Sequence, residues 1–253
     1  MAMKLGSASL AALLLAGLGA TAQAAPNLVQ NGSFESSSYT SSNQFGTGYG
    51  GQGVTDWAGN GGFNIYYFGS TAFSTAPGDQ PNTQYTSPSQ PQNLWGGPHP
   101  SPDGGNFVGL DGEQTPGVQG AISQTINGLI VGQTYTLNFD WAAGQIQSRT
   151  GPTTEQLQAS LGGQSFTTSV VDNPNQGFTG WFTDSFTYTA TATSEVLSFL
   201  SIGTPTGLPP IALLDGVSLT QNVPEPSTLA LMLTGIGAVG FLVRRRRSSM
   251  GAA

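Results

Sequence analysis

The chain contains no cysteine, a single histidine and very few basic residues. The absence of cysteine excludes disulfide bonds, thiolate nucleophiles and cysteine-ligated zinc or iron–sulfur sites. Charged residues make up only 8% of the 253 residues, well below the roughly 25% of ordinary globular proteins. Gly and Pro, by contrast, number 37 and 16. A sequence that is polar but largely uncharged favours turns and short strands over helices.

Basic residues are almost confined to the two ends of the chain. Between Pro26 and Val223 the only Lys or Arg is Arg149, whereas twelve of the 13 Asp and Glu residues, all but Glu225, lie there. This segment, called the body below, is too acidic to offer a positively charged surface for a phosphate backbone, and we expect no nucleic-acid binding. Its carboxylates are suited instead to divalent cations or to keeping the protein soluble.

Residues 1–24 have the order of a secretory signal peptide. Lys4 supplies the positive charge, and residues 10–18, mostly Leu and Ala, supply the apolar segment. This segment is much shorter than the ~20 residues that a membrane span requires, which argues against an N-terminal anchor. An A-x-A cleavage site ends at Ala24, so we expect export with cleavage after Ala24.

The C-terminal tail, residues 223–247, has three parts in a fixed order. The first is stiff and extended because it contains two prolines: Pro224, Glu225 and Pro226. The second, residues 227–243, is predominantly apolar, and as a helix it would span about 25 Å, slightly less than a hydrocarbon core. The third is a basic cluster that stops transfer and keeps residues 248–253 in the cytoplasm: Arg244, Arg245, Arg246 and Arg247.

Together, the Pro-Glu-Pro triplet, the single apolar span and the arginine cluster resemble the PEP-CTERM sorting signal of Gram-negative bacteria. The resemblance implies that a membrane-embedded exosortase recognises the tail and cleaves it near the triplet. It also implies a host that makes exopolysaccharide and biofilm matrix. We therefore expect a protein that the C-terminal transmembrane helix holds at the inner membrane before processing, and that then reaches the cell surface or the extracellular matrix.

Alternation of apolar and polar residues recurs through residues 25–222 and predicts β-strands. It is clearest in residues 134–141 and continues in four further segments: 156–161, 181–189, 195–202 and 211–220. No stretch before the tail has a sustained apolar stripe of helical period. Residues 36–106 are rich in Gly, Ser, Pro, Asn and Gln, with strand candidates only around Trp57 and at 63–68. We expect an all-β sandwich or barrel, with long loops over one end formed by residues 36–106.

Five motifs follow one another along this body: residues 27–35, 54–57, 103–110, 120–125 and 213–219. Their order resembles galactose-binding-like jelly rolls, a group that includes carbohydrate-binding modules and DUF642-type surface proteins. The resemblance implies a jelly-roll β-sandwich over residues 25–222, and it leaves the ligand open.

Glu35 in the opening motif and Asp215 in the closing motif are the main candidates for a metal site. In such jelly rolls the first and last strands pair, and the resemblance implies a structural calcium with these two carboxylates among its ligands. Calcium requires several oxygens at 2.3–2.6 Å, so backbone carbonyls would have to complete the shell. The alternative is that each carboxylate caps a turn or lies in solvent. We expect no other cofactor.

Aromatic side chains in the loop-rich half are candidates for glycan binding, because rings stack on the apolar faces of sugars: Tyr66, Tyr67 and Trp95. The other tryptophans lie on strand patterns and are expected in the core: Trp57, Trp141 and Trp181.

No catalytic signature is present. His99 lies in a proline-rich loop that would position a general base poorly. The paired carboxylates of a glycosidase stay open, since their separation is spatial. We therefore expect a non-catalytic surface or matrix protein that binds exopolysaccharide or another glycan. A secreted polysaccharide-acting hydrolase and a purely structural or adhesive biofilm-matrix protein are the alternatives.

Overall fold

The computed structural model describes residues 25–46, 53–74, 93–97, 99–147 and 149–222, together with the helical pair Gly235 and Ile236. No helix in these described ranges is both long and apolar enough to cross a membrane. The predicted signal peptide and the predicted processing residues lie outside the described residues: Ala24, Pro224, Glu225, Pro226, Arg244, Arg245, Arg246 and Arg247.

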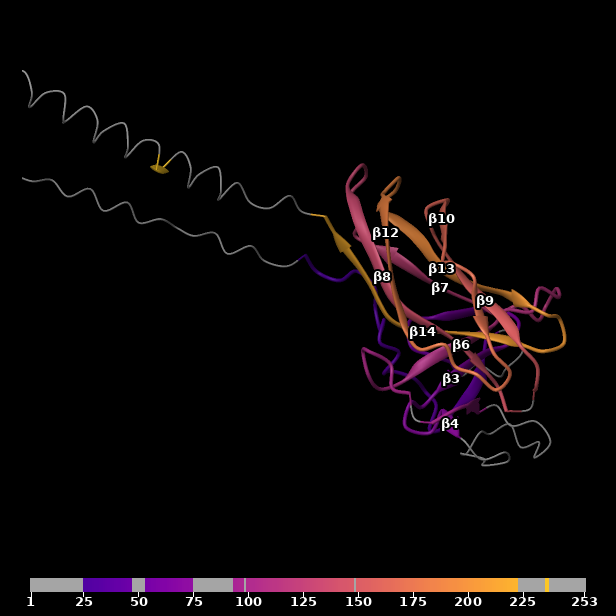
Figure 1. Ribbon diagram of the computed structural model, residues 1–253. Helices are drawn as coiled ribbons and strands as arrows, with labels where there is room; N and C mark the ends of the chain where they lie inside the picture. Colours follow the sequence, from indigo (N-terminus) through magenta and orange to yellow (C-terminus); the bar gives the residue numbers. More distant parts are fainter. Residues whose placement is uncertain are drawn as a thin grey trace, which may run out of the picture. The chain divides into compact units, whose positions relative to one another are not determined.

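Two antiparallel sheets carry the fold (Figure 1). In the six-stranded sheet the strand order is β1 (Asn43–Phe45), β3 (Asn64–Tyr67), β6 (Phe107–Asp111), β14 (Pro210–Gln221), β8 (Thr134–Gln145) and β12 (Phe182–Thr189). In the second sheet it is β10 (Gln164–Thr167), β9 (Thr153–Leu161), β13 (Ser194–Thr204), β7 (Ala121–Asn127) and β2 (Ala58–Gly61), with β11 (Val171–Asn173) paired to β9.

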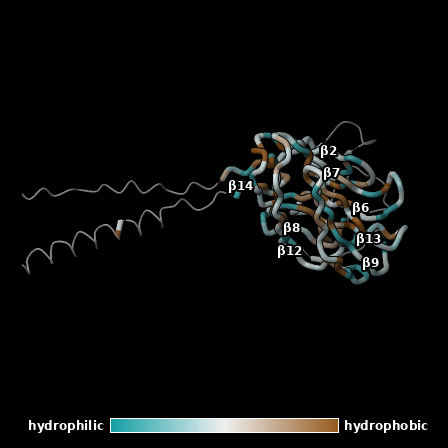
Figure 2. The backbone as a smooth tube through the Cα atoms, turned by 90° about the horizontal axis from the view of Figure 1, so that it is seen from above, coloured by the Kyte–Doolittle hydropathy of each residue, from teal (hydrophilic) through white to brown (hydrophobic). Residues whose placement is uncertain are grey.

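The main core lies between these two sheets, because alternate residues of each strand point inward. Inward-facing residues of β8, such as Phe139 and Trp141, pack with residues of the facing sheet, such as Leu157 and Phe199. The rings of Phe139 and Phe199 meet edge to face with centroids 5.1 Å apart. Figure 2 shows hydrophobic and hydrophilic residues alternating along the strands. Trp57 and Trp141, expected in the core, are 6% and 1% exposed.

A second apolar cluster covers the outer face of the six-stranded sheet. It contains outward-facing residues of the sheet, such as Leu213, and residues near two short parallel strands, β4 (Phe73–Ser74) and β5 (Leu94–Trp95). Trp181 packs against it, half buried. Residues 36–106, predicted as long loops over one end, thus contribute β1 to β5 and part of the cover over a sheet face.

The opening and closing segments of the body lie side by side. Asn27 bridges to Thr220, and the N–H of Leu28 donates to the carbonyl of Leu219 at 2.9 Å. A side chain at Gly32 would begin 1.9 Å from the carbonyl oxygen of Val217, so only glycine allows this approach. Pairing of the first and last segments agrees with the expected jelly roll, and the all-β sandwich is confirmed.

Candidate functional site

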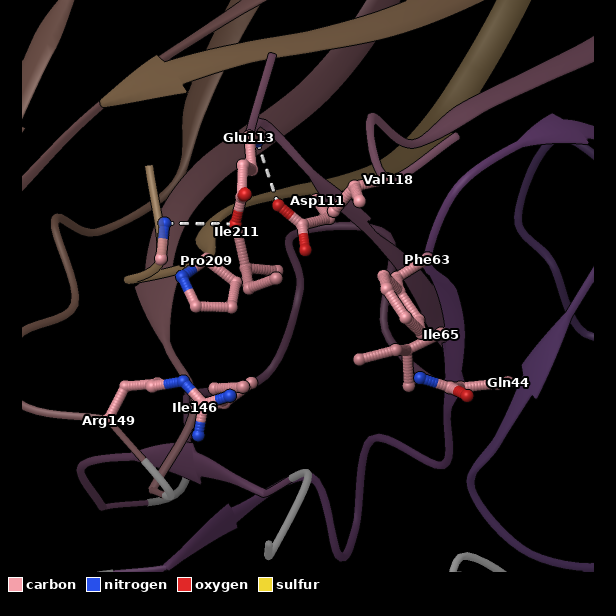
Figure 3. A pocket seen from close by; sticks show the side chains of 11 residues that line it. Gln44, Phe63, Ile65, Asp111, Glu113, Val118, Ile146, Arg149, Pro209 and Ile211 are labelled. Carbon is pink, nitrogen blue, oxygen red and sulfur yellow. Dashed lines mark hydrogen bonds between the residues drawn. The ribbon is translucent and has the colours of Figure 1, made fainter. Parts of the chain in front are cut away.

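A pocket of about 290 Å³ opens at the end of the six-stranded sheet where β6 ends and β14 begins (Figure 3). Its floor is apolar: Ile65 and Ile211 lie on the outer face of that sheet, and Ile146 directly follows β8. Further apolar groups form the walls: Phe63, Val118 and Pro209. The volume lies near the lower end of the range for small-ligand sites. The pocket thus suits a small ligand that has an apolar face.

Two carboxylates lie together on one side of this pocket (Figure 3). Asp111 is the last residue of β6, and its Oδ1 accepts the N–H of Glu113 at 2.8 Å. The Glu113 carboxylate accepts the hydroxyl of Thr115 at 2.8 Å and the N–H of Gly207 at 3.0 Å. These hydrogen bonds fix both side chains in position.

Burial raises the pKa of Asp111 from 3.8 to about 7. The hydrogen bond from the Glu113 N–H lowers this pKa in part. The negative charge of the Glu113 carboxylate raises it, and the positive charge of Arg149 lowers it. Near neutral pH the Asp111 carboxyl is therefore divided between its protonated and ionised forms. It can accept a hydrogen bond in either form and donate one when protonated.

Arg149 and Gln44 supply polar groups on the other sides of the pocket (Figure 3). Arg149 is the only Lys or Arg between Pro26 and Val223. Gln44 is 5% exposed, and its Oε1 has no hydrogen-bond partner in the described part of the chain. A buried acceptor in that state costs about 1–3 kcal/mol unless water or a ligand supplies a donor. The pocket thus combines an apolar floor with fixed donors and acceptors.

The aromatics predicted to bind sugar are buried: Tyr66, Tyr67 and Trp95 are 1%, 0% and 8% exposed. Tyr66 lies in the main core and donates its hydroxyl to the carbonyl of Phe34 at 2.9 Å. Tyr67 lies in the second cluster, with its ring centroid 5.4 Å from that of Phe107. The expectation of exposed tyrosines is wrong because both faces of β3 are covered. Neither tyrosine is available to stack on a sugar ring.

Glu35 and Asp215 share one electrostatic neighbourhood. Asp215 lies at a bulge in β14, is fully buried, and neither of its carboxylate oxygens has a hydrogen-bond partner among the described residues. Glu35 accepts two hydrogen bonds from Asn106, one from its backbone N–H and one from its side-chain amide.

Burial raises the pKa of Asp215 from 3.8 to about 8. The nearby Ser101 hydroxyl and Gly216 N–H oppose this rise only in part, and the carboxylates of Asp103 and Glu35 add to it. A buried carboxylate without a basic neighbour stays protonated unless a cation binds it. Two unpartnered buried oxygens therefore fit the calcium that the resemblance implies.

Within residues 25–222, as far as the structure describes them, no three Asp, Glu or His side chains converge closely enough to hold a metal ion. A calcium at Asp215 would thus need backbone oxygens as well. His99 packs as an aromatic ring, stacked on Phe178 at 4.4 Å and edge-on to Phe73 at 5.2 Å. This environment gives it a packing role.

The pocket residues Asp111 and Glu113 were missed as a candidate pair at the sequence level. The available signal was weak: an Asp-Gly-Glu triplet directly follows the apolar run of residues 107–110. Arg149 stands out in the sequence only as the single cation of the body.

The fold and the C-terminal motif define the class of protein. The PEP-CTERM protein-sorting motif matches residues 222–247, so this is a jelly-roll β-sandwich protein with a PEP-CTERM tail. That motif implies an exported protein that an exosortase sorts. The family model described as "Protein of unknown function (DUF642)" matches residues 86–217, more than half of the chain. The chain belongs to the DUF642 family.

Solved structures similar to this chain include two carbohydrate-binding modules. The CBM22-1 xylan-binding domain of Xyn10C from Paenibacillus barcinonensis is 14% identical, with 79% of this chain and 97% of that chain covered and a TM-score of 0.36. TmCBM61, solved in complex with β-1,4-galactotriose, is 14% identical, with 78% and 99% covered and a TM-score of 0.35. No curated protein matches the chain.

Proposed function

We propose that this protein is an exported, non-catalytic glycan-binding protein of a Gram-negative bacterium. In this proposal the C-terminal helix holds it at the inner membrane, an exosortase-type enzyme processes the tail, and the body then serves at the cell surface or in the exopolysaccharide matrix. The sorting motif at residues 222–247 supports the export step. The pocket beside β6 supports the binding step.

The observation that best supports glycan binding is that the pocket combines an apolar floor with polar side chains. A sugar ring presents an apolar face and a rim of hydroxyls, each of which donates and accepts. The pocket offers the apolar floor of Ile65 and Ile211, an acidic side at Asp111 and Glu113, and the guanidinium of Arg149. In the proposed complex the floor contacts the ring face while these polar groups bind hydroxyls.

The alternative is a polysaccharide hydrolase, because two carboxylates line one pocket and the pKa of Asp111 is raised to about 7. Glycosidases use such a pair as acid and base or nucleophile. Here, however, Glu113 accepts the Thr115 hydroxyl and the Gly207 N–H. A carboxylate that holds a loop in place with both oxygens is poorly suited to attack or to proton transfer, which favours binding over hydrolysis.

We also propose that Asp215, with Glu35 beside it, holds a structural calcium. The support is the pair of unpartnered, buried oxygens on Asp215. Bound calcium would tie the opening segment of the body to its last strand, and it would neutralise a carboxylate that otherwise must stay protonated.

The test of glycan binding is retention of the purified full chain on a panel of insoluble polysaccharides, including exopolysaccharide from a PEP-CTERM-bearing host. Released reducing ends are measured in the same samples. Asp111→Asn and Arg149→Gln each replace one ionisable group of the pocket by a neutral amide. Asp56→Asn is the matched control, because Asp56 is exposed and lies outside this pocket.

We expect wild type and Asp56→Asn to be retained, and each pocket variant to bind about tenfold or more weakly, as for loss of a hydrogen bond to a charged group. Retention of no polysaccharide by wild type would reject glycan binding. Release of reducing ends by wild type but not by Asp111→Asn would replace the binding proposal with the hydrolase.

A further inference from the structure

A second group of buried polar side chains lies away from the pocket, on the inward face of β9 and β11. Thr153 and Glu155 of β9 are 3% and 0% exposed, and Asn173 of β11 is 1% exposed. We call these three residues the β9–β11 cluster. Polar residues so deeply buried need partners, because an unmet donor or acceptor costs free energy.

The sheet register brings these three side chains together. Asn173 is directly opposite Thr153 in the antiparallel pair, so both side chains point to the same face. Glu155 follows two residues after Thr153 and shares that face. The Thr153 hydroxyl donates to Glu155 Oε1.

Three polar atoms of the cluster have no hydrogen-bond partner in the described part of the chain. They are Oε2 of Glu155 and both side-chain atoms of Asn173, Oδ1 and Nδ2. Asn173 Oδ1 and the carbonyl oxygen of Pro174 lie 2.5 and 2.6 Å from where a side chain at Gly177 would begin. A side chain at position 177 would collide with these two oxygens, so they lie close together against Gly177.

No basic residue of the body is left to neutralise Glu155. Arg149 is the only Lys or Arg between Pro26 and Val223, and it lines the pocket beside Asp111. The charge that acts on Glu155 is the carboxylate of Asp172, which has the same sign. Burial, together with Asp172, raises the pKa of Glu155 to about 8, and the Thr153 hydroxyl opposes this only in part.

We propose that the β9–β11 cluster is a second divalent-cation site, with calcium bound by Glu155, Asn173 Oδ1 and nearby backbone oxygen. The donors are all oxygen, which is the ligand type that calcium prefers. A separate hollow of about 400 Å³ lies on the other face of the same strands, where Thr154, Asp172 and Thr204 line it and Glu155 does not. This site is separate from Asp215, which lies on another sheet.

In this proposal the bound ion stabilises the pairing of β11 with β9. β11 has only three residues and pairs with β9 alone, off the main path of its sheet. A cation shared between Glu155 on β9 and Asn173 on β11 would bind the folded state and not the unfolded chain. Calcium would therefore raise the stability of this region.

The test is calorimetric titration of the EDTA-treated full chain with calcium chloride, repeated on three variants with folding checked by circular dichroism. Glu155→Gln removes the charged ligand and keeps its shape. Asp215→Asn leaves the β9–β11 cluster untouched and reports on the other calcium proposal. Asn173→Asp adds a carboxylate to the cluster, and it keeps the test decisive if Glu155→Gln fails to fold.

We expect Glu155→Gln to lose one calcium equivalent that Asp215→Asn retains, and Asn173→Asp to bind that equivalent about tenfold or more tightly, because affinity rises with ligand charge. The proposal is overturned if wild type and Glu155→Gln bind the same number of calcium ions with the same affinity. It is also overturned if only Asp215→Asn loses calcium, or if wild type binds none. If Glu155→Gln does not fold, the proposal is overturned when Asn173→Asp binds calcium with the same affinity as wild type.

Discussion

Replacing Asp215 by asparagine tests how the buried carboxyl of this residue affects the pH dependence of stability. The amide has nearly the same shape as the carboxyl and does not ionise. Asp215 is fully buried, and its pKa is raised from 3.8 to about 8. In the metal-free protein the variant should therefore remove one proton-linked contribution to stability and leave the surrounding packing in place.

The sign and size of this contribution follow from linkage. Because the folded-state pKa of Asp215 is raised, the folded state holds a proton that the unfolded chain releases above about pH 4. Stability then falls as pH rises, by about 1.4 kcal/mol per pH unit, and it levels off above the folded pKa. Between pH 5 and pH 7 wild type loses about 3 kcal/mol through Asp215 alone, equivalent to about 5–10 °C in Tm.

The assay is thermal unfolding of the EDTA-treated full chain at pH 5, 6 and 7. We expect Tm to fall less steeply for Asp215→Asn than for wild type, by about 5–10 °C over this range. Asp56→Asn is the control and should follow wild type, because Asp56 is exposed. Parallel curves for wild type and Asp215→Asn would refute the argument that Asp215 is buried in its neutral form.

Two further predictions concern packing, and both are measured by urea unfolding. Gly105→Ala should destabilise the fold by more than the ~1–2 kcal/mol of left-handed backbone strain. Its Cβ would lie 1.8 Å from Glu35 Oε1, so the carboxylate would have to move and lose its hydrogen bonds from Asn106. Gly104→Ala, with a similar positive φ and open space, should cost only the strain. Phe199→Ala should cost about 3–5 kcal/mol as a fully buried ring, whereas Val196→Ala, exposed on the same strand, should change stability by no more than about 0.5 kcal/mol. Equal losses within either pair would contradict the packing that the structure describes.

The strands that could be predicted from the sequence are those with one covered face. Residues 134–141 alternate and lie in β8, but β8 continues to Gln145 through residues that are all buried. There the second cluster covers the outer face, so the alternation disappears. β6 is buried at every position for the same reason. The strands β1 to β5 are two to four residues long, too short for any period to appear.

The pocket could not be predicted, because its polar groups come from distant segments. Gln44 lies on β1, Asp111 on β6 and Arg149 in the loop between β8 and β9, and only the folded sheet brings these segments together. The prediction that Tyr66 and Tyr67 are exposed failed for a similar reason, because it depends on tertiary packing. Tyr66 and Tyr67 point to opposite faces of β3, and only knowledge of what packs on each face shows that both are buried. Glu35 and Asp215 could be predicted as neighbours, because opening and closing segments pair in the fold that the sequence resembles.

Charge composition and burial together limit how this fold can be stabilised. Among the described residues, the carboxyls of Asp111, Glu155 and Asp215 are at most 2% exposed, while residues 25–222 contain one arginine, which lies near Asp111. Internal ion pairs therefore cannot neutralise Glu155 and Asp215. The remaining ways are protonation, which fails as pH rises through about 8, and cations from solution. For an exported protein, binding of calcium at both sites would keep the sandwich stable at the alkaline end of this range, where the metal-free protein is weakest.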